Sequence, residues 1–297
     1  MTDPQDKTYI HGHHPSVLTS HSSRTLANSA AYLLPYLEPY KASSSSSSSP
    51  TRILDAGCGP GTITCDIAAL LPGAQVTGID YLLQETCAPL AASRGLTNVH
   101  FQESDICKLP FPNDSFDVVH VHQVLQHLPT PPTRAVAELL RVCKSGGVIA
   151  VREADFGAFT FHPSGADALA RTVTTAGSTL DRWREVYIAT ARAAGGDPFA
   201  GRKLQRWFMD AGVQRADIVC SASCWTYSTS EERRWWGVMW AERTLKSSFA
   251  EQAVRNGVVA GEDELKQLAA AWEAWAAEED GWLMVPSGEV VVRVRKD

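Results

Sequence analysis

The sequence predicts a doubly wound α/β fold, in which helices cover both faces of a mostly parallel sheet. From residue 51 onward, strand-like apolar segments alternate with helical segments, which is the arrangement of parallel βαβ units. The first strand-like segment ends in an acidic residue and then in three glycines at alternate positions. Because glycine permits positive φ and lets the backbone approach a ligand closely, this turn predicts a nucleotide-type binding site at the N-terminus of the next helix.

The predicted elements can be placed in order along the chain. A helix over 24–37 carries an apolar face that ends near Pro39, and the serine run 43–49 behind it predicts a solvated loop. Strands are predicted over 52–55, 75–80, 99–106, 115–122, 148–153, 213–226 and 289–294. Helices are predicted over 62–71, 82–94, 132–143, 167–194, 198–211, 231–256 and 262–279.

The spacing of the glycine turn narrows the class of ligand. A dinucleotide-binding turn would place its third glycine or alanine at position 62, where this chain has Thr62. Asp55 adds a negative charge beside the turn, which suits a ligand with an ammonium or sulfonium group and repels a diphosphate. The alternative is a tight connection from strand to helix that holds no ligand.

Two further strands also end in acidic residues. Asp80 closes the strand 75–80 about 20 residues after the glycines, where a carboxylate can accept hydrogen bonds from both hydroxyls of a ribose. Asp105 closes the next strand and is followed by the apolar Ile106. For Asp80 and Asp105 the alternative is a loop carboxylate that caps a helix or a turn.

With these motifs in this order, residues 50–155 resemble the class I S-adenosylmethionine-dependent methyltransferases. Within that class the chain is similar to the ubiquinone/menaquinone-biosynthesis C-methyltransferases. The resemblance implies a Rossmann-like sheet of seven strands, the last of them antiparallel, with an N-terminal helical lid and helical insertions near the C-terminus. It divides the chain into a lid, helix and serine-rich loop over 1–50, a cofactor-binding core over 51–160, and a helical substrate cap with the last strands over 161–297.

The resemblance also assigns the cofactor, S-adenosyl-L-methionine, to individual positions. The backbone at the glycine turn would meet its methionine part, Asp80 its ribose, and Asp105 and Ile106 its adenine. His122 and Gln123 would line the pocket near the sulfonium, although His122 could equally lack that role. The implied cofactor-binding residues are Asp55, Ala56, Gly57, Gly59, Gly61, Asp80, Asp105, Ile106, His122 and Gln123.

Two candidate catalytic residues lie at the end of the fifth strand and just beyond it. Ligands of open α/β sheets lie beyond the carboxyl ends of the strands, so Glu153 and Asp155 are expected near the transfer site. They could orient a substrate or accept its proton, and they could equally pair with Arg152 or cap the next turn. Methyl transfer needs a base only if the acceptor arrives protonated, and the candidates for that role are His122, His13, Glu153 and Asp155.

Histidines cluster near the N-terminus, in Tyr9–Pro15. A metal site is one interpretation, but no cysteine pair or carboxylate lies nearby and class I methyl transfer needs no metal, so we expect none. A solvated tail is a second interpretation. The third is a lid in which Tyr9, His13 and His14 fold over the cofactor mouth, with Ser16 and His21 on the following turn.

Composition limits the compartment and the partners. The formal net charge is −6 with no long basic run, so a nucleic acid is not expected as substrate. No apolar run is long enough to cross a bilayer, and the N-terminus lacks a basic-then-apolar signal pattern. Seven scattered cysteines without a Cys-x-x-Cys pair favour a reducing compartment, so we expect a cytoplasmic monomer or homodimer that acts on a small molecule.

The C-terminal half is helical and rich in tryptophan. Trp235, Trp236 and Trp240 fall at helical spacing, and such a stripe either belongs to a core or roofs a substrate cavity. The expected function is methyl transfer by in-line displacement to a small, apolar metabolite whose acceptor atom is carbon, oxygen, nitrogen or sulfur. The alternatives are a non-catalytic scaffold that binds the same cofactor and a nicotinamide-dependent oxidoreductase on a similar fold.

Overall fold

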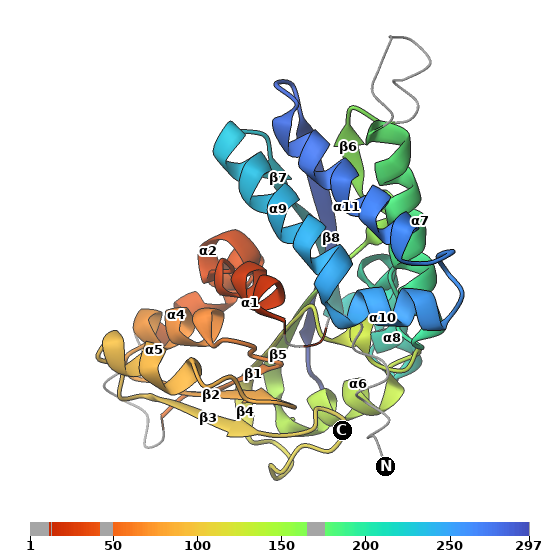
Figure 1. Cartoon of the computed structure of the whole chain (residues 1–297). Coiled ribbons are helices and arrows are strands. Elements are labelled where there is room, and N and C mark those ends of the chain that lie inside the picture. Colours follow the sequence, from red (N-terminus) through yellow and green to blue (C-terminus); the bar gives the residue numbers. More distant parts are fainter. Residues whose placement is uncertain (1–11, 13, 42–49, 165–175, 297) are drawn as a thin grey trace.

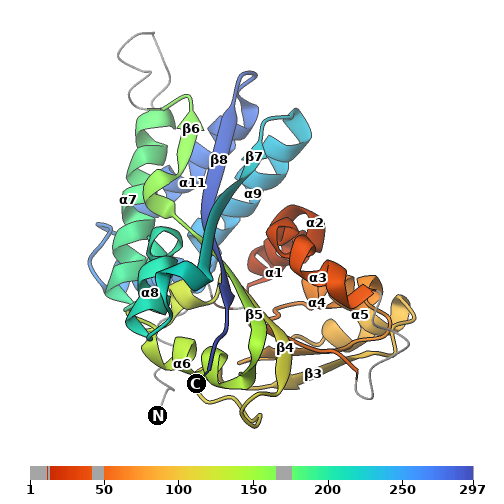
Figure 2. The ribbon, with the colours of Figure 1, turned by 180° about the vertical axis from the view of Figure 1, so that it is seen from behind.

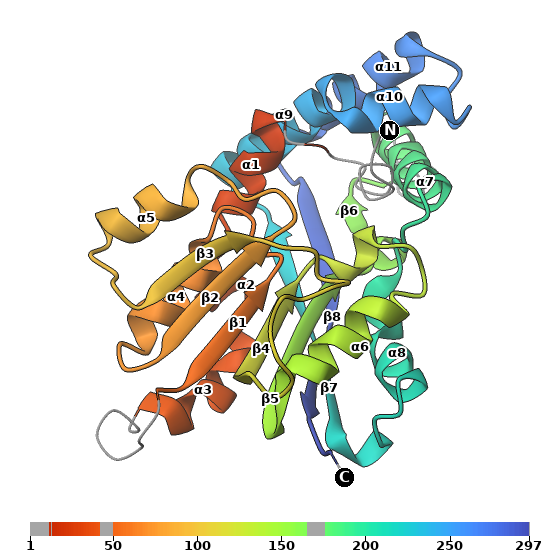
Figure 3. The same ribbon diagram turned by 90° about the horizontal axis from the view of Figure 1, so that it is seen from below.

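The computed structural model describes residues 12, 14–41, 50–164 and 176–296, and in them eight strands form one mixed sheet. Its order is β3-β2-β1-β4-β5-β8-β6, with β7 on β8 (Figure 3). The first five strands pair in parallel, and β5, β6 and β7 each pair antiparallel with β8. The strands are β1 (Arg52–Ala56), β2 (Gln75–Asp80), β3 (Val99–Glu103), β4 (Phe116–His122), β5 (Cys143–Ala154), β6 (Thr160–His162), β7 (Ile218–Tyr227) and β8 (Trp282–Arg293).

The eighth strand arises because β8 is long. β7 pairs with it from Val292 to Leu283, so β7 occupies one edge of β8 along almost its whole length. On the other edge β5 pairs with Arg293 to Ser287, and the short β6 then pairs with Met284 to Trp282. The described residues therefore form one strand more than the expected seven, and β8 is antiparallel to β5 as predicted.

Helices cover both faces of the sheet. On one face α3 (Leu34–Lys41) and α4 (Thr62–Leu70) enclose a core that includes Leu37, Ile67 and Ala150. On the other face α6 (Thr133–Val142) and α8 (Leu204–Asp210) enclose a core that includes Leu139, Phe208 and Val121. The remaining helix beside the parallel strands is α5 (Cys87–Ser93), and the short 3-10 turns are η1 (Ala31–Leu33), η2 (Leu125–His127), η3 (Phe156–Ala158), η5 (Ala200–Lys203) and η6 (Arg215–Asp217).

A helical cap extends the sheet at the end formed by β6, β7 and β8 (Figures 1 and 2). It consists of α7 (Ala176–Ala193), α9 (Ser230–Lys246), α10 (Ser248–Arg255) and α11 (Glu262–Ala277). Its core is aromatic: the Trp183 ring meets the rings of Trp240 and Trp272 edge to face, with centroids 4.7 and 4.8 Å apart. Edge-to-face pairs of this kind fix the orientation of the helices above the sheet.

Two short N-terminal helices, α1 (Pro15–Ser22) and α2 (Leu26–Ser29), lie between the parallel strands and α9 (Figure 1). The His14 side chain caps α1, and Thr25 with Asn28 forms a capping box at the start of α2. The Arg243 guanidinium of α9 donates to the Ser16 carbonyl oxygen at 2.8 Å and to the Ser20 hydroxyl at 2.6 Å. These bonds attach α1 to the cap.

Two predicted helices are broken in the structure. The helix expected over 24–37 is divided into α2, η1 and α3, because the backbone leaves the helical region at Ala30, where φ is −137°. The helix expected over 231–256 ends at Lys246, because the Ser247 hydroxyl caps the start of α10. The serine run 43–49 and the first residues of the helix expected over 167–194 lie outside the described residues.

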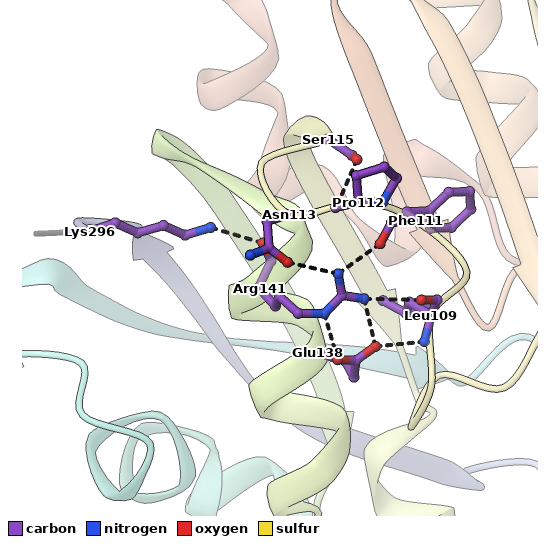
Figure 4. A network of polar contacts seen from close by, with 8 residues as sticks. All are labelled: Leu109, Phe111, Pro112, Asn113, Ser115, Glu138, Arg141 and Lys296. Carbon is purple, nitrogen blue, oxygen red and sulfur yellow. Dashed lines mark hydrogen bonds and ion pairs between the residues drawn. The ribbon is translucent and has the colours of Figure 1, made fainter.

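A polar network holds the segment that joins β3 to β4 (Figure 4). The Arg141 guanidinium of α6 donates to the carbonyl oxygens of Leu109 and Phe111 at 3.0 and 2.7 Å. Glu138 pairs with Arg141 and also accepts from the Leu109 N–H at 2.7 Å. The start of this segment, at Ser104 and Ile106, lines a cavity described below, so the network supports one wall of that cavity from behind.

Candidate functional site

Two cavities lie beyond the carboxyl ends of the parallel strands. We call the first the glycine-loop cavity, which has a volume of about 180 Å³. Its walls come from the loop after β1, the ends of β2 and β4, the loop after β3, and α1. Of the residues predicted to bind a cofactor, this cavity is lined by Asp55, Gly57, Gly59, Asp80, Ile106, His122 and Gln123.

The glycine loop has a conformation that only glycine adopts readily. Gly57, Gly59 and Gly61 have φ of 82°, 53° and 83°, all in the left-handed region. A Cβ atom on Gly57 would stand 2.1 Å from a methyl carbon of Val124, whereas one on Gly59 would meet nothing within 4 Å. Gly61 and Ala56 are not among the lining residues: Gly61 is the N-cap of α4, and Ala56 is fully buried in β1.

Two neighbouring side chains hold the Asp55 carboxylate in place. It accepts from the Thr64 hydroxyl at 2.6 Å and contacts the Nδ1 atom of His120 at 2.8 Å. All three side chains are almost fully buried. These contacts fix the carboxylate at the wall of the cavity, and neither Thr64 nor His120 carried a signal in the sequence that would have singled it out.

The two other acidic strand ends differ in their contacts. Asp80 lines the cavity, and its carboxylate accepts from the Gly59 N–H at 2.8 Å, which ties β2 to the glycine loop. Asp105 does not line the cavity, and its carboxylate accepts from the Cys107 N–H at 2.7 Å in a turn. Its neighbours Ser104 and Ile106 do line it.

His122 is the last residue of β4, and Gln123 follows it. The His122 side chain is 5 % exposed, and within the described part of the chain neither of its ring nitrogens has a hydrogen-bond partner. Burial, together with the positive charges of Arg24 and Arg152, holds the pKa of His122 well below its usual range, so the imidazole is neutral. Gln123 has a φ of 53°, which is uncommon for a residue with a side chain and is frequent at functional sites.

The second cavity, which we call the aromatic cavity, has a volume of about 700 Å³. It lies between α1, α2 and η1 on one side and β7, α9 and the chain around Phe156 on the other. Its aromatic lining residues are Tyr32, Phe156, Phe159, Tyr187, Trp225, Tyr227, Trp235, Trp236 and Trp240. Trp236 and Trp240 also belong to the core of the cap, so the tryptophan stripe serves both as core and as cavity wall.

A polar row crosses the sheet beside the aromatic cavity, and of its members Glu289 lines that cavity. Arg152 stands opposite His122 on β4 and opposite Glu289 on β8. The Arg152 guanidinium is fully buried, lies 4.3 Å from the centre of the Trp225 ring, and donates to Ser223 at 3.0 Å. Glu289 lies 3.6 Å from Arg152 and accepts from the hydroxyls of Ser221 and Ser223, so the buried charges compensate each other.

The two cavities adjoin. Four residues line both of them: His21 in α1, Arg24 just after α1, and Gln123 and His127, which follow β4. Burial and the positive charge of Arg24 lower the pKa of His127 to about 3, so this second imidazole at the junction is also neutral. Arg24 and His127 were not singled out in the sequence, because their places are set by how α1 and η2 pack against each other across the end of the sheet.

Comparisons with known proteins decide the family. Residues 54–151 match the model of a methyltransferase domain. The chain is 30 % identical over 306 residues to an uncharacterized methyltransferase of Schizosaccharomyces pombe, with 99 % of each chain covered. It is 29 % identical over 299 residues to the "Probable methyltransferase ltbC" of Aspergillus luteorubrus, with 94 % of each chain covered. The chain belongs to the class I S-adenosylmethionine-dependent methyltransferases.

A solved structure agrees at the level of the fold. Phosphoethanolamine N-methyltransferase 2 of Haemonchus contortus is 14 % identical to this methyltransferase with a TM-score of 0.55, and the match covers 99 % of this chain and 61 % of that one. The cofactor of this methyltransferase is S-adenosylmethionine, which follows from the family to which the chain belongs. The glycine-loop cavity fits it: the lining has acidic groups for a cation, a neutral His122 that does not repel a sulfonium, and an apolar Ile106.

The structure corrects the expectation for two of the catalytic candidates in this methyltransferase. Glu153 is fully buried, and its carboxylate accepts from the N–H groups of Val124, Leu125 and Gln126 at 2.7 to 3.3 Å. Asp155 forms a two-pronged ion pair with Arg202 and caps the Gly157 N–H. Neither residue lines either cavity, so both carboxylates hold backbone and ion-pair structure around the site.

The N-terminal candidates are divided between described and undescribed residues. Tyr9 and His13 lie outside the described residues. His14 caps α1, and Ser16 accepts from Arg243, while His21 lines both cavities of the methyltransferase. Across residues 12, 14–41, 50–164 and 176–296, no group of three metal-ligating side chains and no helix able to cross a membrane is found.

Proposed function

We propose that this methyltransferase transfers the methyl group of its cofactor to a small, largely apolar acceptor bound in the aromatic cavity. One observation carries the proposal: the glycine-loop cavity and the aromatic cavity share His21, Arg24, Gln123 and His127. A methyl group leaving the first cavity would enter the second at these residues. In-line displacement needs this arrangement, because donor and acceptor atoms must face each other with water excluded.

The lining of the aromatic cavity supports a flat, uncharged ring system as acceptor. Nine aromatic rings line it, and its buried charges already have partners: Glu289 with Arg152 and two serines, and Arg243 with α1. A charged acceptor would compete with these pairs, whereas a planar ring system would stack on the walls. Cavities of this size typically hold molecules of the size of a drug.

Three buried polar atoms in the same lining support a polar edge on that acceptor. The Tyr32 hydroxyl, the Gln126 Oε1 atom and the Trp236 Nε1 atom have no hydrogen-bond partner among the described residues. Buried polar groups are normally paired, so these atoms favour an acceptor that carries hydroxyl, carbonyl or amine groups. A hydroxyl or amine on such an edge would also serve as the atom that receives the methyl group.

The roles of individual residues around the cofactor are part of the proposal. The glycine loop would meet the methionine part, Asp80 would accept from the ribose hydroxyls, and Ile106 would pack on the adenine. The cofactor supplies an activated methyl group on a positively charged sulfur. The chain would align the acceptor with it and exclude water, and orientation of that kind lowers a barrier by about 7–11 kcal/mol. Because His122 and His127 are neutral, their imidazoles would not repel the positive charge of the sulfonium.

Two finer assignments belong to the same proposal. We propose that the chain is related to the ubiquinone/menaquinone-biosynthesis C-methyltransferases, as its ordered motifs suggest. We also propose a reducing compartment such as the cytosol, since all seven cysteines are free thiols. A scaffold that binds the cofactor without transfer is the alternative from another functional class.

Incubation with a methyl-labelled cofactor tests the function. Flat phenols and aromatic amines should receive label, and aliphatic or multiply charged acceptors should not. Tyr32→Phe should raise the Michaelis constant of an accepted phenol by a few-fold to tenfold, because one hydrogen bond contributes about 0.5–1.5 kcal/mol. Tyr36→Phe, a substitution outside both cavities, is the matched control. Persistent cofactor binding with no label in any acceptor class would favour the scaffold.

A further inference from the structure

We propose that Cys58 and Cys87 form a redox-sensitive thiol pair at the glycine loop, which a hydroperoxide oxidises to a disulfide and which then weakens cofactor binding. This inference goes beyond the proposed function. It rests on the cofactor, which is shared with the whole family, and not on the identity of the acceptor. No other part of the proposed function enters it.

The two thiols meet at one backbone atom. Cys58 stands between Gly57 and Gly59 and lines the glycine-loop cavity, and Cys87 is the first residue of α5. The carbonyl oxygen of Gly59 accepts from the Cys58 thiol at 3.8 Å and from the Cys87 thiol at 3.2 Å. Each side chain also shifts the pKa of the other. The sulfur atoms are therefore neighbours, although 29 positions separate them in the sequence.

The contact makes the two thiols unequal. Contact with Cys58 lowers the pKa of Cys87, and contact with Cys87, together with burial, raises the pKa of Cys58. Burial raises the pKa of Cys65 and Cys107 to about 11 and that of Cys143 to about 12. Because the thiolate is the reactive form, Cys87 is the thiol most ready to react among these buried cysteines.

The chemistry balances with a hydroperoxide as the oxidant. The Cys87 thiolate attacks one peroxide oxygen, the O–O bond breaks, and Cys87 becomes a sulfenic acid while hydroxide leaves. The Cys58 thiol then attacks the Cys87 sulfur, the S–O bond breaks, and the Cys58 proton leaves with the hydroxyl as water. Overall, two thiols lose two electrons, and hydrogen peroxide is reduced to water. Thiols such as those of glutathione reverse the change.

The bond would disturb the loop that carries the cofactor site. Gly59 is held by its N–H bond to Asp80 and by the two thiols that donate to its carbonyl oxygen. A disulfide has no S–H group, so the Gly59 carbonyl would lose both of these donors at once. In the other direction, a bound cofactor covers Cys58 in the cavity wall and would shield the pair from peroxide.

The test uses the reduced full chain treated with hydrogen peroxide. Digestion without reductant, followed by mass spectrometry, should show the Cys58 and Cys87 peptides joined. The affinity for S-adenosylhomocysteine, measured by calorimetry, should fall by about tenfold or more, a readily measured difference. Dithiothreitol should restore it. Saturation with S-adenosylhomocysteine before the treatment should slow the cross-linking.

Two variants distinguish oxidation of this pair from oxidation elsewhere in the chain. C87S should lose both the cross-link and the fall in affinity caused by peroxide, whereas C220S, at an exposed cysteine of β7, should respond as the natural chain does. The inference is overturned if the two peptides are not joined, if joining leaves the affinity unchanged, or if C87S responds to peroxide like the natural chain. None of these measurements requires an acceptor, so the test remains valid even if the proposed class of acceptor is wrong.

Discussion

The Arg243 guanidinium donates a 2.6 Å hydrogen bond to the Ser20 hydroxyl, and both side chains are almost fully buried. Because α1 contributes to both cavities, this contact links the helical cap to the place where cofactor and acceptor would meet. The guanidinium also lies 4.4 Å from the centre of the Trp240 ring, in the wall of the aromatic cavity. The position of α1 therefore depends on one side chain of α9.

Replacement of Arg243 should loosen α1 without unfolding the sheet. Arg243→Met removes hydrogen bonds that are each worth about 1.5–3 kcal/mol when a charged group donates them. The Michaelis constants for both cofactor and acceptor should rise together, measured by steady-state kinetics. Arg255→Met, which breaks an exposed pair with Glu251 at 4.0 Å, is the control and should change neither. A rise for the acceptor alone would contradict a shared role of α1.

Two glycine substitutions can separate the cost of a positive φ from the cost of a steric clash. Gly57→Ala places a side chain at a φ of 82° and also drives a Cβ atom to 2.1 Å from Val124, so it should lower both stability and cofactor affinity. Gly95→Ala has a φ of 65° but meets nothing within 4 Å, so it should cost only about 1–2 kcal/mol of stability from the backbone. Thermal unfolding and calorimetry with S-adenosylhomocysteine measure both. Equal destabilisation by the two variants would argue against the Val124 contact.

Asp80 is predicted to bind the ribose of the cofactor. Asp80→Asn keeps an oxygen that can accept from Gly59 but loses the charge, and S-adenosylhomocysteine should bind about 10- to 150-fold more weakly, equivalent to about 1.5–3 kcal/mol. Asp80→Ala should weaken binding further, because it also frees the Gly59 N–H. Asp210→Asn, at an exposed carboxylate paired with Arg206 on α8, is the control. Unchanged affinity in Asp80→Asn would reject the ribose role.

Glu153 predicts a pH dependence of stability with a defined sign. Burial raises the pKa of Glu153 to about 7 in the folded protein, above the usual value near 4.5 that it has in the unfolded chain. Between these two pH values the folded state holds the extra proton, so the contribution of Glu153 to stability falls as the pH rises from about 4.5 to about 7. Above that range the loss is complete, at no more than about 3 kcal/mol.

Chemical denaturation across that range provides the measurement. Glu153→Gln cannot ionise, so its stability should fall less than that of the natural chain between pH 5 and pH 7, a window that follows from the shifted pKa. Glu185→Gln, at an exposed carboxylate on α7, serves as the control and should leave the slope as it is. Parallel pH profiles for Glu153→Gln and the natural chain would show that this carboxylate does not titrate in the window.

The parallel half of the fold follows closely from local sequence. β2 has the predicted bounds 75–80, and α4 ends one residue before the predicted 71, because short apolar runs bounded by glycines and acids leave few alternatives. The predictions fail where contacts between segments far apart in the sequence determine the structure. The three-residue β6 forms only because β8 offers a free edge, and the break at Ala30 carries no glycine or proline.

Of the candidate site, the glycine-loop cavity follows from the order of motifs in the sequence, whereas the aromatic cavity does not. The glycine-loop cavity gathers residues from consecutive strand ends, a geometry that the order of motifs implies. The aromatic cavity joins Tyr32, Gln126 and Trp236, which lie far apart in the sequence and meet only through α1, α2 and α9. Glu153 and Asp155 were expected at the transfer site because they follow a strand, but the orientation of such side chains depends on which backbone N–H groups and arginines need a partner.

The described lining of the aromatic cavity contains no residue between 33 and 122, so β1, β2, β3, α4 and α5 take no part in it. Apart from the four shared residues, the lining that would receive the cofactor is thus separate from the surfaces that would choose among acceptors. A chimera that keeps residues 12–24 and 50–128, which include the whole described lining of the glycine-loop cavity, and takes its other segments from a relative should inherit the relative's selectivity while retaining its own affinity for the cofactor. Substitutions in the aromatic cavity outside the four shared residues can therefore change the choice of acceptor without changing the lining of the cofactor site.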